Sequence, residues 1–155
     1  MLRYLVRSVA YPVPDPNPPS AQLRRGPRPL RFLDMPTQRQ DYLLRMIAQA
    51  AAALRRLRER LVGGDAPAEI VEEARAAQRE LLGKDASLLR ALEPTTAAGL
   101  VGDRRRIALW AELVRVEGAA LRREGRDAEG AALEARADAL ARLGDPSALA
   151  AADDA

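Results

Sequence analysis

The chain has 155 residues, 48% of them apolar and 3% aromatic, with 25 basic side chains, 22 acidic ones and a formal net charge of +3. This length suits a single domain with a modest core. The absence of Cys excludes disulfides and thiolate chemistry, and the absence of His excludes imidazole bases and the common zinc ligand sets. No apolar run approaches the roughly 20 residues that cross a bilayer.

The positive charge lies at the N-terminus, where seven arginines and two aspartates give residues 1–40 a net charge of +5. Eight of the eleven prolines lie in the same segment. Because proline fixes φ and removes a backbone donor, residues 1–34 are predicted to be a disordered Pro/Arg-rich tail. Two alternatives stay open: residues 1–10 form a targeting segment, or Met35 is the translation start and the tail is not translated.

The remaining chain, residues 41–155, carries a net charge of −2 and has a helical apolar period up to residue 144. The first helix is expected over residues 37–62, because its apolar residues step by four and three along one stripe; Gly63-Gly64 follows as a C-terminal cap. The second helix is expected to start after Asp65, as an N-cap, and to stop at Gly83.

Residues 85–102 are more broken, with Pro94 between two expected short helices. Longer helices are expected over residues 103–125 and 127–144, each beginning with Asp and ending at Gly. The predicted fold class is all-α, with about four main helices in two antiparallel hairpins joined by a short irregular helical segment. The helical domain is expected to span residues 35–145, followed by a frayed tail over residues 146–155. Each hairpin joins a basic helix to an acidic one, which favours the pairing.

Three stretches resemble a bacterial all-helical domain family of unknown function. They are the Asp41-Tyr42-x-x-Arg45-x-Ile47 start, Leu81-Leu82-Gly83-Lys84-Asp85 with the leucines that follow, and residues 113–137. The last stretch also resembles one tetratricopeptide unit, with Gly118, Gly125 and Ala137 at the small positions. This resemblance covers roughly residues 35–143 and implies a fold but no activity. It also favours Met35 as the start.

Two arginine clusters are candidate anion sites. Arg104, Arg105 and Arg106 begin a helix, where free N–H groups and guanidinium groups together suit a phosphate or an acidic peptide. The alternative is that Asp103 caps the helix and the arginines pair with acidic neighbours or face water. The second cluster is Arg55, Arg56, Arg58 and Arg60; it is spread around its helix and is predicted to be a solvated face against the acidic second helix.

Trp110, Leu113 and Leu121 share one helix and are candidates for binding a partner; the spacing of Trp110 between Ile107 and Val114 favours the core, with a partner anchor as the alternative. Glu117 and Glu134 fall near apolar faces, where they form either a pair with shifted pKa values or edge residues with their carboxylates in water. Without His, the Glu-x-x-His pattern of helical di-metal sites is missing, and the serines and threonines have no imidazole to activate them.

The expected function is therefore a non-enzymatic protein–protein interaction or scaffold module in the cytoplasm, without a cofactor or metal and with a tendency to self-associate. The alternative is binding of nucleic acid or another polyanion through the tail and the arginine clusters.

Overall fold

A computed structural model describes residues 34–147 and 149–150, with side chains from residue 38 onward. Every regular element within these residues is a helix, so the predicted all-α class is confirmed. The predictions for residues 1–33 and 151–155, including the disordered N-terminal tail, lie outside the described residues.

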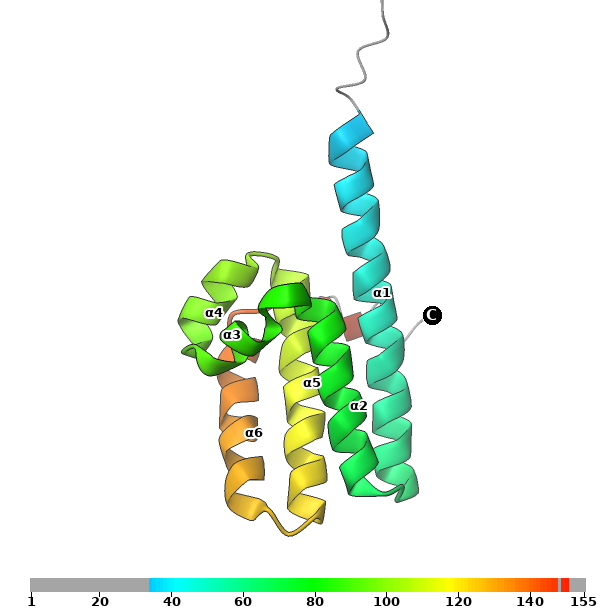
Figure 1. Cartoon of the computed structure of the whole chain (residues 1–155), viewed down its shortest axis with the longest axis vertical. Coiled ribbons are helices and arrows are strands. Elements are labelled where there is room, and N and C mark those ends of the chain that lie inside the picture. The colour runs from blue at the N-terminus through cyan, green and yellow to red at the C-terminus, as the bar shows by residue number, and fades with distance from the viewer. Residues whose placement is uncertain (1–33, 148, 151–155) are drawn as a thin grey trace, which may run out of the picture. The chain divides into compact units, whose positions relative to one another are not determined.

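Four long helices form two antiparallel hairpins (Figure 1). The first hairpin joins α1 (Asp34–Gly63) to α2 (Pro67–Leu82), and the second joins α5 (Arg104–Arg123) to α6 (Asp127–Ala141). A 3-10 turn (Gly83–Asp85) and two short helices, α3 (Ala86–Ala91) and α4 (Pro94–Val101), connect the hairpins. The predicted arrangement is confirmed in its helix order and in the irregular segment at residues 83–101.

Of two predicted N-cap residues, Asp103 caps its helix and Asp65 does not. Asp103 caps α5 as predicted, because its Oδ1 accepts the backbone N–H groups of Arg105 and Arg106 at 2.9 Å each. Asp65 does not cap α2: that helix starts at Pro67, and Ala66 precedes it without a side-chain cap. The Asp65 carboxylate instead accepts a 2.7 Å hydrogen bond from Nε of Arg60.

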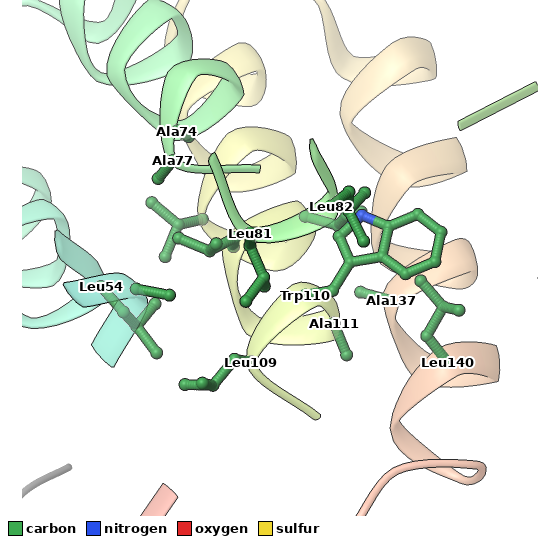
Figure 2. Packing of buried hydrophobic residues seen from close by; sticks show 14 of the residues in the cluster. Leu54, Ala74, Ala77, Leu81, Leu82, Leu109, Trp110, Ala111, Ala137 and Leu140 are labelled. Carbon is green, nitrogen blue, oxygen red and sulfur yellow. The ribbon is translucent and has the colours of Figure 1, made fainter. Parts of the chain in front are cut away.

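Helix α5 is the centre of the fold and packs against α6, α2, α1 and α4. Twelve of its 20 residues are buried, so it is covered on most of its circumference. Apolar residues of the helices packed against it cover α5; Figure 2 shows Leu54 of α1, Leu81 of α2 and Leu140 of α6 around it.

The α5–α6 pair is the closest helix contact and depends on two glycines. A Cβ atom built on Gly130 lies 2.6 Å from the carbonyl oxygen of Gly118, and one built on Gly118 lies 2.9 Å from that of Gly130. Real Cβ atoms do not approach backbone oxygen this closely. Gly118 and Gly130 therefore allow the two backbones to meet.

Candidate functional site

The residues predicted to bind a partner lie in the core. Trp110 and Leu113 are 0% exposed and Leu121 is 1% exposed. The ring of Trp110 lies on the α6 side of α5 with Ala137 and Leu140 (Figure 2), and the guanidinium carbon of Arg136 is 5.5 Å from the ring centroid. These three side chains are covered by the chain itself and form no exposed binding surface.

The three arginines at the start of α5 do not converge on one site. Arg106 Nη2 donates to the Leu81 carbonyl at 2.6 Å, near the C-terminal end of α2. Arg104 Nη2 donates to the Gly144 carbonyl at 3.4 Å, and Arg105 is exposed. Two of the three guanidinium groups therefore bond to carbonyls on different segments, after α6 and at the end of α2.

The second arginine cluster contacts the acidic second helix through Arg60, as predicted, but Arg58 pairs instead with α5. Arg60 bonds to Asp65, Glu69 and Glu73, and Arg58 Nη2 lies 2.7 Å from Glu112 Oε2 of α5. These contacts fix the pairing of α1 with α2 and α5. Polyanion binding through residues 1–34 stays a prediction, because residues 1–33 are outside the described part of the chain.

A buried charge cluster joins α2, α3 and α5. Glu117 of α5 is 0% exposed, and its two carboxylate oxygens accept hydrogen bonds from three side chains. Arg75 Nε donates to Oε1 at 2.8 Å and Gln78 Nε2 donates to Oε2 at 2.8 Å. Arg90 of α3 donates to both oxygens at 3.0 Å, in a bidentate pair.

This cluster keeps Glu117 ionised inside the protein. Burial raises the pKa of Glu117, but hydrogen bonds from Arg90, Arg75 and Gln78 outweigh it and hold that pKa below its ordinary value. Arg90 Nη1 also donates to Gln78 Oε1 at 2.8 Å. The carboxylate is therefore fully paired, which suits a structural junction between the hairpins.

The prediction that Glu117 pairs with Glu134, or keeps its carboxylate in water, is wrong for Glu117. Glu134 lies apart from the cluster and forms a 2.9 Å ion pair with Arg122. The arginines of the cluster were missed by sequence reasoning, although a signal exists. Val71, Arg75, Gln78 and Leu82 step by four, three and four residues, so two polar residues lie on a helix stripe bounded by apolar ones.

An apolar groove of about 340 Å³ lies at the connecting segment, lined by residues of α2 to α5. Leucines and a valine dominate its lining, and Asp85 and Arg106 are the two charged members; the full set is Leu82, Asp85, Leu88, Leu89, Leu100, Val101 and Arg106. Leu88 and Leu100 are 55% and 64% exposed. The groove thus combines apolar walls with charged groups, the composition of a small protein-binding surface.

No known protein family, curated protein or solved structure matches this chain. The similarity to a bacterial helical family and to one tetratricopeptide unit therefore stays a prediction. None of the described helices is long and apolar enough to cross a membrane. Among the described residues, no group of three or more acidic residues could hold a metal ion.

Proposed function

We propose that this chain is a helical protein–protein interaction module, and that the groove between α3 and α4 receives an apolar side chain of its partner. The observation that carries the proposal is the exposure of Leu88 and Leu100 on the walls of a formed groove. Exposed leucines scattered singly need no explanation, but two that line one hollow indicate a binding surface.

The groove suits an anchor residue. Its volume of about 340 Å³ accommodates an aliphatic or aromatic side chain, and burying such an anchor in a desolvated pocket supplies much of the binding energy of many interfaces. Asp85 and Arg106 provide a polar rim that favours one orientation of the partner. The absence of catalytic activity and the cytoplasmic location expected from the sequence are kept as parts of this proposal.

Affinity capture with the full chain tests the proposal. Leu100→Lys places a charge in the groove, whereas Val62→Lys makes the same change at an apolar residue of α1 that is 85% exposed and outside the groove. The wild type and Val62→Lys are expected to retain the same bound protein from cells of the source organism, and Leu100→Lys is expected to lose it. Equal retention by all three chains contradicts the proposal.

Light scattering on the purified chains determines whether the partner is a second copy. Self-association that disappears in Leu100→Lys and persists in Val62→Lys identifies the partner as the chain itself. A monomer at all concentrations, together with groove-dependent capture, identifies a different protein as the partner.

A further inference from the structure

A second hollow, of about 290 Å³, lies between α2 and α3 and has a different chemical character from the apolar groove. Three of its five lining residues are arginines, and the other two are small: Arg75, Arg79, Ala86, Ser87 and Arg90. None of these five is acidic. The hollow is therefore a concentration of guanidinium groups with a hydroxyl beside them.

Two arginines of the hollow are held in place by a buried carboxylate. Arg75 and Arg90 bond to the buried carboxylate of Glu117 through Nε of Arg75 and both Nη atoms of Arg90. Arg75 Nη2 and Arg90 Nε take no part in these bonds. Because the buried Glu117 fixes the two guanidinium groups before any ligand arrives, a ligand does not have to immobilise them.

The three arginines of the hollow differ in how they are paired. Glu117 and Glu72 are the carboxylates bonded to its arginines, while Arg79 is exposed and has no ion pair among the described residues. Among the described residues, Arg79 is therefore the arginine of the hollow that is available to an incoming anion.

We propose that the hollow formed by Arg75, Arg79, Arg90 and Ser87 binds the phosphate group of a small molecule. The two oxygens of a carboxylate are already satisfied by one guanidinium group. The three oxygens of a phosphate accept hydrogen bonds from several donors that converge from different positions. The volume of about 290 Å³ is at the lower end of ligand pockets. It therefore accommodates a phosphate with a small organic group.

Titration of the isotopically labelled full chain with inorganic phosphate, at constant ionic strength, tests the proposal by nuclear magnetic resonance. Saturable shifts are expected at the Ser87 amide and at the Nε–H signals of Arg79 and Arg90. Arg79→Gln is expected to weaken phosphate binding at least about tenfold, the loss typical of a charge-assisted hydrogen bond. Ser87→Ala is expected to weaken it by a smaller factor.

Arg105→Gln is the matched control, because it removes the same charge from an exposed arginine outside the hollow. Phosphate affinity is expected to stay unchanged in this variant, and acetate is expected to bind the wild type more weakly than phosphate does. Arg79 and Ser87 are exposed, so both hollow variants are expected to keep the wild-type circular dichroism and unfolding midpoint.

Three results overturn the inference: shifts that never saturate, equal weakening by Arg79→Gln and Arg105→Gln, or acetate binding as tightly as phosphate. The inference is independent of the proposed protein-binding function. Leu100→Lys alters the apolar groove and leaves the residues of this hollow in place, so failure of one proposal is distinguishable from failure of the other.

Discussion

Two regions of this molecule depart from the rule that apolar side chains lie inside and polar ones outside, and they depart from it in opposite directions. At the junction of α2, α3 and α5, the carboxylate of Glu117 is fully buried. At the connecting segment, Leu88 and Leu100 are more than half exposed. The first region is polar where an apolar core is expected, and the second is apolar where a solvated surface is expected.

The two regions differ in whether the chain itself supplies contacts for the unusual side chains. Glu117 is bonded to Arg75, Gln78 and Arg90, so the chain itself supplies everything that the buried charge needs. Leu88 and Leu100 line a groove that the described residues leave open. A buried polar group that is satisfied internally indicates a structural role, whereas an apolar surface without internal cover is the basis of our proposal that a partner covers it.

Glu117→Gln is expected to produce the largest effect. Removing the charge leaves Arg90 without its anion and Arg75 with only the exposed Glu72, and breaking one side of a buried ion pair costs about 3 kcal/mol. The control is Glu134→Gln, which breaks the half-exposed pair with Arg122 and is expected to cost less than about 1 kcal/mol. Urea unfolding measures both values. Equal losses would show that Glu117 is not a special junction.

Gly130→Ala is expected to have the next largest effect. The added Cβ lies 2.6 Å from the Gly118 carbonyl oxygen, next to Glu117 in the chain, so the α5–α6 contact has to open at a cost of about 1–3 kcal/mol. Gly99→Ala is the matched control, because nothing lies within 4 Å of a Cβ at that helical position. It is expected to stabilise the protein by about 0.5–1 kcal/mol. If Gly130→Ala and Gly99→Ala lower the free energy of unfolding by similar amounts, the close approach of α5 and α6 at Gly130 is contradicted.

Acid is expected to remove part of the stability that Glu117 provides. Because the pKa of Glu117 is lowered in the folded protein, its contribution is present above the ordinary pKa of a glutamate and is lost as the pH falls through the lowered value. The wild type is therefore expected to lose more stability than Glu117→Gln between pH 7 and pH 3, measured by urea unfolding at each pH. Parallel losses in the two proteins contradict this role of the carboxylate.

Leu100→Lys is expected to have the smallest effect on stability. Leu100 is 64% exposed, and surface substitutions of this kind change the free energy of unfolding by less than about 0.5 kcal/mol. A loss above about 2 kcal/mol, in the same urea measurement, would place Leu100 in the packed core and remove the contrast between the two regions.

The sequence predicted the four long helices and their order, because the apolar spacing, the glycines and the Asp103 cap all act locally. Trp110 also fell at a core position by spacing, as the structure shows. The Glu117 cluster could not be predicted in the same way, since the residues that its hydrogen bonds join lie 12 to 42 positions apart in the chain. The groove was missed for a similar reason: Leu88 and Leu100 belong to different short helices that only the tertiary fold brings together.

Site-specific photo-cross-linking tests most directly the claim that the groove is the partner-binding surface. Two variants are prepared: in the first, a photoreactive phenylalanine analogue replaces Leu100, and in the second it replaces Val62. Both variants are irradiated in cells of the source organism. Val62 is the more exposed of the two, at 85% against 64%, so accessibility alone favours cross-linking at Val62. We predict one discrete adduct from position 100 and none of comparable yield from position 62. Equal adducts at both positions, or an adduct only at position 62, would contradict the account.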